Sequence, residues 1–186
     1  MKNIYLIGMM GSGKSTVGKI LSKKMKKPFI DLDSEIEKTG GKSVSEIFNG
    51  NGEGKFRQME SEQLKQYSES VVACGGGIVL KDENRHFIKE NGIAILLTAS
   101  MEELSQRLSN LGNRPLLADD NTVDALTKLW LERQLDYLNT ADFTIETDGE
   151  NPEKLTEKIL LLINSGKQEK DNWEKDPIPF IWNRAY

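Results

Sequence analysis

Residues 4–15 read IYLIGMMGSGKS, a short apolar run followed by the pattern G-x-x-x-x-G-K-S at Gly8–Ser15. The apolar run predicts a short buried strand, and the apolar residues at helical spacing after Lys14 predict a helix. Glycines between a strand and a helix let backbone N–H groups converge where the helix begins, and phosphate is favoured there. The stretch therefore predicts a phosphate-binding loop, with Lys14 reaching the β- and γ-phosphates of a nucleotide and the Ser15 hydroxyl binding Mg²⁺. A glycine-rich turn with a fortuitous Lys-Ser pair is the alternative, and the flanking strand and helix disfavour it.

The composition is that of an ordinary soluble domain. The chain has 186 residues, of which 37% are hydrophobic and 29% are charged. Its net charge of −4 disfavours non-specific binding to nucleic acid, so an anion site would have to be local. The single cysteine, Cys74, excludes an internal disulfide, and no apolar run approaches the roughly 18 residues of a membrane span. With no recognisable signal peptide, these features predict a cytoplasmic protein that binds neither nucleic acid nor a membrane.

Predicted strands alternate with predicted helices along the chain. We expect strands at residues 3–7, 29–31, 71–74, 93–98 and 142–146. We expect helices at residues 14–26, 34–39, 43–49, 52–68, 82–90, 100–109, 122–139 and 152–164. This alternation, with several fully apolar strands, predicts a three-layer α/β fold, in which helices cover both faces of a parallel sheet. Ligands collect beyond the carboxyl ends of such strands, where the phosphate loop, Asp31, Asp33 and the glycines at 75–77 would meet.

Two carboxylates follow the second predicted strand. Asp31 and Asp33 would point to the same side of an extended chain, since side chains alternate with a period of two. One could help to hold hydrated Mg²⁺, and the other could accept a hydrogen bond from a substrate hydroxyl. Asp33 or Ser34 could also cap the next helix, in a pattern like a capping box that Glu37 completes, and the two roles are compatible.

Two arginines are candidates for binding an anion. On a helix, Arg57 lies four residues after Glu53 and three before Glu60, so either carboxylate could hold its guanidinium; a surface salt bridge is the alternative. Arg133 shares one helical stripe with three apolar or aromatic residues, Leu126, Trp130 and Tyr137. An arginine on an apolar face is costly unless it meets an anion, which is either a ligand or a carboxylate of the protein itself.

Two further features would lie near the same edge of the sheet. The glycines at 75–77 could form a hinge, or they could let a ligand approach the backbone closely. Arg107 lies shortly before a loop expected at residues 110–121, and Arg114 lies within it. An arginine on a mobile loop over a phosphate site can neutralise charge on a transferring phosphoryl group.

Taken together, the motifs of residues 3–163 resemble those of the shikimate kinase family. The matching elements are the phosphate loop with Thr16, the stretch Phe29–Glu37, Ile47-Phe48 followed by Gly52-Glu53 and Phe56-Arg57-x-x-Glu60, the three glycines, Arg114–Leu117, and Arg133-x-x-x-Tyr137. Only the phosphate loop is specific by itself, but all of them occur in the family's order. The resemblance implies a P-loop NTPase-type fold with a five-stranded parallel sheet in the order 2-3-1-4-5 and a mobile lid at about residues 110–121. It also implies ATP-dependent phosphorylation of the 3-hydroxyl of shikimate, giving shikimate 3-phosphate and ADP, in the biosynthesis of aromatic amino acids.

On the acceptor side, the resemblance implies roles for individual residues. Asp33, Arg57, Gly77 and Arg133 match the family's shikimate contacts, with Gly75 and Gly76 beside them. Arg57 and Arg133 would bind the carboxylate of shikimate, and Asp33 would bind the ring hydroxyls.

On the nucleotide side, the resemblance implies a binding loop made of Gly11, Ser12, Gly13, Lys14, Ser15 and Thr16. Arg107 matches a position that packs on adenine, and Arg114 would contact the nucleotide and stabilise the transferring phosphoryl group together with Lys14. With Asp33, these two residues would form the catalytic set. Ser15 and Asp31 would lie around Mg²⁺.

Residues 1–164 are expected to form one shikimate-kinase-like domain, and the protein is expected to be a monomer. Residues 165–186 extend beyond the usual end of the family and carry Trp173 and Trp182. Because disordered tails seldom concentrate aromatic residues, we expect this extension to dock on its own domain or on a neighbour.

Two alternative functions compete with this interpretation. Another small-molecule kinase of the same fold, such as a gluconate-kinase-like enzyme, would leave the combination of Arg57, Arg133 and the three glycines unexplained. A non-enzymatic, kinase-like binding protein would usually have lost the phosphate-loop lysine or a carboxylate, and this chain retains them.

Overall fold

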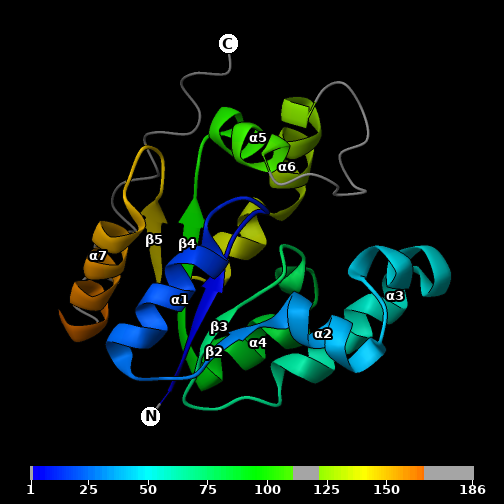
Figure 1. Cartoon of the computed structure of the whole chain (residues 1–186), viewed down its shortest axis with the longest axis horizontal. Coiled ribbons are helices and arrows are strands. Elements are labelled where there is room, and N and C mark those ends of the chain that lie inside the picture. The colour runs from blue at the N-terminus through cyan, green and yellow to red at the C-terminus, as the bar shows by residue number, and fades with distance from the viewer. Residues whose placement is uncertain (1, 111–121, 166–186) are drawn as a thin grey trace.

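A computed structural model describes residues 2–110 and 122–165 of the chain (Figure 1). Within these residues, five strands form one parallel sheet in the order β2-β3-β1-β4-β5. The strands are β1 (Asn3–Ile7), β2 (Phe29–Asp31), β3 (Val71–Ala73), β4 (Gly92–Thr98) and β5 (Phe143–Glu146). The predicted α/β fold and strand order are therefore confirmed.

The helices follow the strands in alternation. In chain order they are α1 (Lys14–Met25), α2 (Leu32–Gly40), α3 (Val44–Leu64), α4 (Asp82–Asn91), α5 (Met101–Ser109), α6 (Thr122–Thr140) and α7 (Pro152–Ser165), with a short 3-10 turn, η1 (Ile78–Leu80), between β3 and α4. The predicted lid after Asn110 and the extension after Ser165 lie outside the described residues. Within the two described ranges, no helix is long and apolar enough to cross a membrane.

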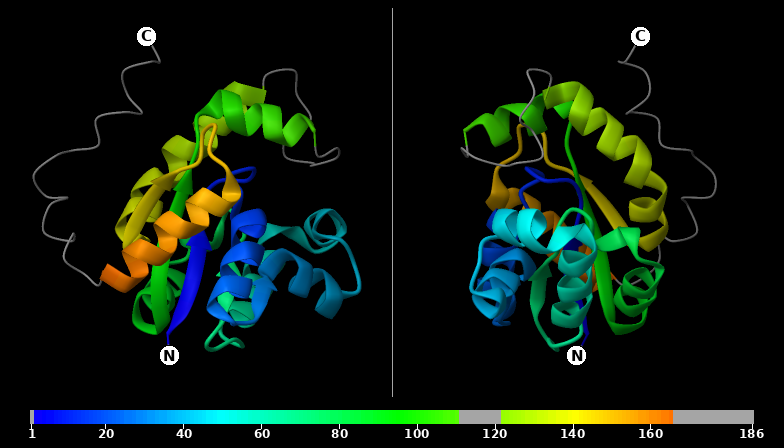
Figure 2. Two further views of the ribbon diagram at one scale, coloured as in Figure 1. Left: turned by 60° about the vertical axis from the view of Figure 1, so that its left-hand side comes forward. Right: turned by 90° about the vertical axis from the view of Figure 1, so that its right-hand side faces the viewer.

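The central strand β1 supplies side chains to two hydrophobic cores, because successive residues of a strand point to opposite faces. Ile4 and Leu6 pack on the face that α1 and α7 cover. Tyr5 and Ile7 pack on the face that α4, α5 and α6 cover. Figure 2 shows α1 and α7 on one side of the sheet and α4 and α6 on the other, which is the predicted three-layer arrangement.

Helix α2 begins two residues before its predicted start, and the reason is its cap. The Asp31 side chain accepts a hydrogen bond from the backbone N–H of Ser34, so Asp31 is the N-cap. The prediction that Asp33 or Ser34 caps this helix is therefore wrong. Asp33 lies in the first helical turn, so Asp31 and Asp33 do not follow the two-residue alternation of an extended chain.

The two helices predicted at residues 43–49 and 52–68 form one element, α3, which ends at Leu64. Its helical geometry is interrupted at Gly52, where φ is 77° and ψ is 163°. A glycine adopts such angles without steric penalty, so the break falls within the predicted glycine-rich stretch. Helices α2 and α3 lie beside β2, at the edge of the sheet (Figure 1), and share a small core of Ile36, Ile47 and Phe56.

Candidate functional site

The phosphate loop lies between β1 and α1, as the sequence predicts. Gly8, Gly11 and Gly13 have φ angles of 137°, 80° and 90°, which favour glycine. A Cβ on Gly8 would also overlap the backbone oxygen of Leu97 on β4. Gly13 immediately precedes α1, so the loop ends at the exposed N–H groups of a helix N-terminus, where an anion is favoured.

The Lys14 side chain folds back over this loop. Its Nζ donates hydrogen bonds to the backbone oxygens of Gly8, at 2.9 Å, and of Met9, at 2.7 Å. Ser15 and Thr16 are exposed in the first turn of α1, and Ser12 is buried. The arrangement places one positive charge and several backbone donors around the same small region.

Ser15 and Asp31 lie together at the ends of α1 and β2. The Ser15 hydroxyl donates a hydrogen bond to Asp31 Oδ2 at 2.6 Å, and Asp31 Oδ1 caps α2. The pair is partly open to solvent. A hydroxyl and a carboxylate are the hard oxygen ligands that suit Mg²⁺. The described residues contain no group of three His, Cys, Asp or Glu side chains that could hold a metal alone, so a cation bound here would need oxygens from a ligand and water.

A network of charges joins Arg57 to both carboxylates that the sequence suggested. Arg57 lies 3.1 Å from Glu53 Oε1 and 2.8 Å from Glu60 Oε2. Its guanidinium also lies 5.2 Å from the centre of the Phe56 ring. Burial by itself would lower the pKa of Arg57, but the two glutamates outweigh it and raise that pKa. Arg57 is therefore a fixed, permanently charged donor, unlike the residue of a loose surface salt bridge.

Glu60 is the least exposed member of this network, and the sequence identified it only as a partner of Arg57. Its side chain is 0% exposed, and within the described residues Oε1 has no hydrogen-bond partner. Burial raises the pKa of Glu60, and Arg57 offsets part of that rise. The spacing from Arg57 predicts contact between the two side chains, but nothing in the local sequence indicates that the carboxylate is buried.

The glycines at 75–77 follow β3 and pass directly beside the charged network. A Cβ on Gly75 would lie 2.5 Å from Glu60 Oε1 and 2.7 Å from Asp33 Oδ1. A Cβ on Gly77 would overlap the Arg57 guanidinium. This turn therefore brings Asp33 and Glu60 close to one point of the backbone and Arg57 close to the next. The side chains that approach this backbone closely are the protein's own, and the approach of a ligand to it stays a prediction.

Arg133 reaches the same turn from α6. Its side chain is buried with the other members of the predicted stripe, Leu126, Trp130 and Tyr137. Its Nη1 donates a hydrogen bond to the backbone oxygen of Gly76 at 3.2 Å, and within the described part of the chain its buried Nε has no hydrogen-bond partner. None of the described carboxylates forms an ion pair with it within 4.0 Å. The guanidinium thus keeps donor capacity for an anion that is not part of this region of the protein.

Charged side chains of the phosphate loop, of the end of β2 and of α3 all affect the pKa of one buried thiol, that of Cys74. Burial raises the pKa of Cys74, at the end of β3, and the carboxylates of Glu60, Asp33 and Asp31 raise it further, while Lys14 opposes them. The phosphate loop, the end of β2 and the charged network therefore surround the carboxyl end of β3. This is the edge of a parallel sheet where ligands bind.

Arg107 connects α5 to the rim of the phosphate loop. It donates hydrogen bonds to the Thr147 hydroxyl at 2.9 Å, to the Thr147 backbone oxygen at 2.8 Å and to the Gly11 backbone oxygen at 3.3 Å. Glu103 holds its Nε at 2.8 Å. Arg107 therefore links the phosphate loop to the residue that follows β5, and its contact with the adenine stays a prediction. Arg114, the other arginine predicted here, lies outside the described residues.

Comparisons with known proteins agree with this geometry. A family model described as shikimate kinase matches residues 10–164. The shikimate kinase of Thermodesulfovibrio yellowstonii is 43% identical over 163 residues, which cover 86% of this chain and 94% of the relative. The shikimate kinase of Caldicellulosiruptor bescii is 38% identical over 173 residues, which cover 91% of this chain and 99% of the relative.

Solved structures give the same result. The chain superposes on the shikimate kinase of Acinetobacter baumannii in complex with shikimate with a TM-score of 0.86, at 38% identity, covering 91% of this chain and 96% of the other. The shikimate kinase of Aquifex aeolicus gives a TM-score of 0.75 at 36% identity, covering 88% of this chain and 96% of the other. The identity, the coverage and the family match all point the same way, and this chain belongs to the shikimate kinase family.

Proposed function

We propose that this protein transfers the γ-phosphoryl group of ATP to the 3-hydroxyl of shikimate and releases shikimate 3-phosphate and ADP. The observation that carries this proposal is the position of two guanidiniums, that of the partly buried Arg57 and that of the buried Arg133, beside the turn of glycines 75–77 and next to a phosphate loop. A binding site of this kind suits a small acceptor that carries a carboxylate and is held beside a nucleotide. The membership of the family supports the same reaction.

On the acceptor side, Arg57 and Arg133 bind the carboxylate of shikimate. Guanidinium groups suit this role because they are planar, always charged and able to bind a carboxylate through two parallel hydrogen bonds. Glu53 and Glu60 fix the direction of Arg57. Asp33, which lies beside Gly75, accepts a hydrogen bond from a ring hydroxyl and orients the attacking oxygen.

On the nucleotide side, the backbone from Gly11 to Thr16 binds the phosphates, and Lys14 exchanges its contacts with Gly8 and Met9 for phosphate oxygens. Arg107 lies beside the adenine, and Arg114 neutralises charge on the transferring group. Ser15 and Asp31 would hold Mg²⁺, which would neutralise negative charge on the nucleotide when bound.

A coupled assay of ADP release tests the reaction. Shikimate should stimulate ADP release from ATP and Mg²⁺, and gluconate at the same concentration should not. Stimulation by gluconate alone would identify a different small-molecule kinase of this fold. An absence of stimulation by either compound, with ATP still bound, would favour a binding protein without catalytic activity.

Arg133→Lys should weaken shikimate binding by roughly tenfold or more, because a charge-assisted hydrogen bond contributes about 1.5–3 kcal/mol. Lysine keeps the positive charge but cannot reproduce the two parallel donors of the guanidinium. The affinity for ATP should barely change. Shikimate and ATP are titrated separately against the variant, and its melting temperature is recorded.

Arg85→Lys is the matched control for that variant, because Arg85 binds the Val79 backbone oxygen and two aspartates on α4 and α6. It should leave shikimate affinity unchanged, whatever its effect on stability. If Arg133→Lys instead kept the parent's affinity for shikimate and lowered the melting temperature by several degrees, Arg133 would be a structural residue.

Gly77→Ala should also reduce shikimate affinity by roughly tenfold or more, because its Cβ would occupy the position of the Arg57 guanidinium and displace it. Gly76→Ala serves for comparison, since its Cβ would meet Met10 N only at 3.5 Å, an ordinary contact distance. Its effect should be much smaller. Equal losses of shikimate affinity in the two variants would show that the displacement of Arg57 is not the cause.

A further inference from the structure

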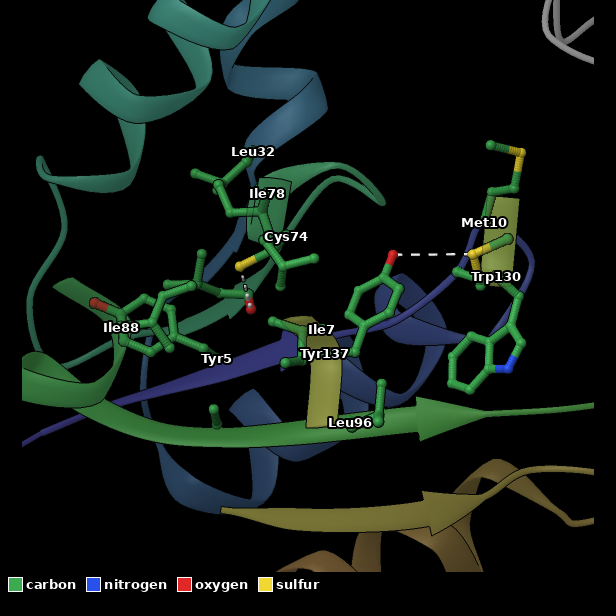
Figure 3. Packing of buried hydrophobic residues seen from close by; sticks show 14 of the residues in the cluster. Tyr5, Ile7, Met10, Leu32, Cys74, Ile78, Ile88, Leu96, Trp130 and Tyr137 are labelled. Carbon is green, nitrogen blue, oxygen red and sulfur yellow. Dashed lines mark hydrogen bonds between the residues drawn. The ribbon is translucent and has the colours of Figure 1, made fainter. Parts of the chain in front are cut away.

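Tyr137 is a buried residue of α6 to which the proposed reaction assigns no task. It lies one helical turn after Arg133, and its side chain is 0% exposed. Its ring stacks on Trp130 with 5.9 Å between the ring centres and 18° between the planes. Figure 3 shows the ring among the buried side chains of Ile7, Leu96 and Trp130, with the hydroxyl pointing away from them.

The Tyr137 hydroxyl lies where three segments of the site meet. It donates a hydrogen bond to the backbone oxygen of Gly76, the same oxygen that accepts from Arg133 Nη1. It also lies 4.0 Å from the sulfur of Met9 in the phosphate loop. A Cβ on Gly76 would in turn lie 3.5 Å from the backbone nitrogen of Met10. Tyr137 therefore contacts both the glycine turn and the phosphate loop.

The chemistry of this contact requires the hydroxyl to act as a donor. A backbone oxygen can only accept, and it has capacity for two donors. Burial raises the pKa of Tyr137 well above its ordinary value, which favours the protonated hydroxyl that this contact needs. Without this donor, the side-chain donor left to the Gly76 oxygen among the residues that the structure describes would be Arg133, at 3.2 Å.

Loss of the Tyr137 hydrogen bond would affect the proposed shikimate-binding residues. Gly75 and Gly77 lie on either side of Gly76, and a Cβ on either would overlap this network: on Gly75 it would meet Asp33 and Glu60, and on Gly77 it would meet Arg57. A shift of the Gly76 peptide would therefore move the backbone of Gly75 and Gly77, which lies against the side chains of Asp33, Glu60 and Arg57. It would also disturb the hydrogen bond from Arg133 Nη1 to the Gly76 oxygen, and the buried Nε of Arg133 has no hydrogen-bond partner within the described residues.

We propose that Tyr137 is a positioning residue for the acceptor, one that holds the Gly76 carbonyl so that Arg133 keeps its guanidinium directed at the carboxylate of the substrate. This inference rests on the proposed function, because it assumes that shikimate binds beside Arg133. The competing role for Tyr137 is packing alone, in which the ring fills the core and the hydroxyl is dispensable.

The variant Tyr137→Phe separates the two roles, since it keeps the ring and removes only the hydroxyl. Loss of one hydrogen bond typically weakens an interaction by about 1 kcal/mol, so the KM for shikimate should rise by about fivefold. The KM for ATP should stay within about twofold. A residue that only packs in the core would lower the melting temperature without separating the two substrates in this way.

Tyr67→Phe is the matched control. The Tyr67 hydroxyl is also part-buried and hydrogen-bonded, to Gln63 at 3.1 Å and Glu35 at 3.3 Å, but Tyr67 contacts Asn3 at the opposite end of β1 from the phosphate loop. This variant should leave the KM values for both substrates at the parent level. The double variant Tyr137→Phe with Arg133→Lys should raise the shikimate KM by clearly less than the product of the two single effects, because both changes act on one interaction.

Three results would overturn the inference. If the parent phosphorylates shikimate and Tyr137→Phe has the same KM for shikimate as the parent, Tyr137 does not position the substrate. The proposed function would then still stand. Independent, multiplicative effects in the double variant would show that Tyr137 does not act through Arg133. A parent enzyme that does not phosphorylate shikimate would contradict the proposed function itself, and the inference would fall with it.

Discussion

Lys14→Ala is expected to reduce turnover of ATP with shikimate by at least about a hundredfold, the usual effect of removing one preorganised donor from a developing charge. Lys14 supplies the only side-chain ammonium that the structure holds over the described phosphate loop, through its contacts with Gly8 and Met9. An alanine leaves the loop glycines and the backbone N–H groups in place. The variant therefore keeps the binding loop and removes the charge that we propose to stabilise the transferring phosphoryl group.

The fold should survive this change. The two cores of the sheet are built from apolar side chains, and Lys14 belongs to neither. Circular dichroism and the steady-state rate are measured on the same preparation. Lys19→Ala is the control, because Lys19 is exposed on the same helix and lies one turn further from the loop. Turnover by Lys14→Ala within tenfold of the parent would contradict the role of the loop as the phosphate site.

Much of this fold could be predicted from local patterns. The strand, loop and helix at the N-terminus have their own signatures, and the stripe of Leu126, Trp130, Arg133 and Tyr137 follows from the helical period alone. The strand order came from the resemblance to a family and the number of layers from the alternation of elements, and both are confirmed. These features depend on residues that are close in the sequence or on a pattern that runs along the whole chain.

The errors and omissions come from contacts between distant segments and from competition between local structures. Asp31 caps α2, and this places Asp33 in a helix instead of in an extended chain. The turn of glycines 75–77 needs residues without a Cβ because the side chains of Arg57 and Glu60 occupy the space beside Gly77 and Gly75. No periodic pattern encodes such a contact.

The same limit applies to Tyr137. It lies 61 residues from Gly76 in the sequence, so its hydrogen bond could be found only in three dimensions. Spacing on α6 places Tyr137 and Arg133 on one face, but it does not reveal that both donate to the same backbone oxygen.

Asp33→Asn is expected to lower kcat by about 10²–10⁴, the usual contribution of a positioned general base. Asp33 lies in the first turn of α2, and its Oδ1 is close to Gly75 and to the buried carboxylate of Glu60. Asparagine keeps the shape of the side chain and removes its negative charge. The attacking hydroxyl then loses both a proton acceptor and the partner that orients it.

The KM for ATP should change little, because the proposed phosphate contacts belong to the loop before α1. Asp82→Asn is the matched control, since Asp82 also lies in the first turn of its helix, α4, and its side chain is 70% exposed. It reproduces the loss of a negative charge at a helix N-terminus and should leave kcat unchanged. The transition state of phosphoryl transfer is loose, so a decrease in kcat near the lower end of the range would indicate that Asp33 mainly positions the hydroxyl. A rise in the KM for ATP with an unchanged kcat would instead place Asp33 on the nucleotide side of the site.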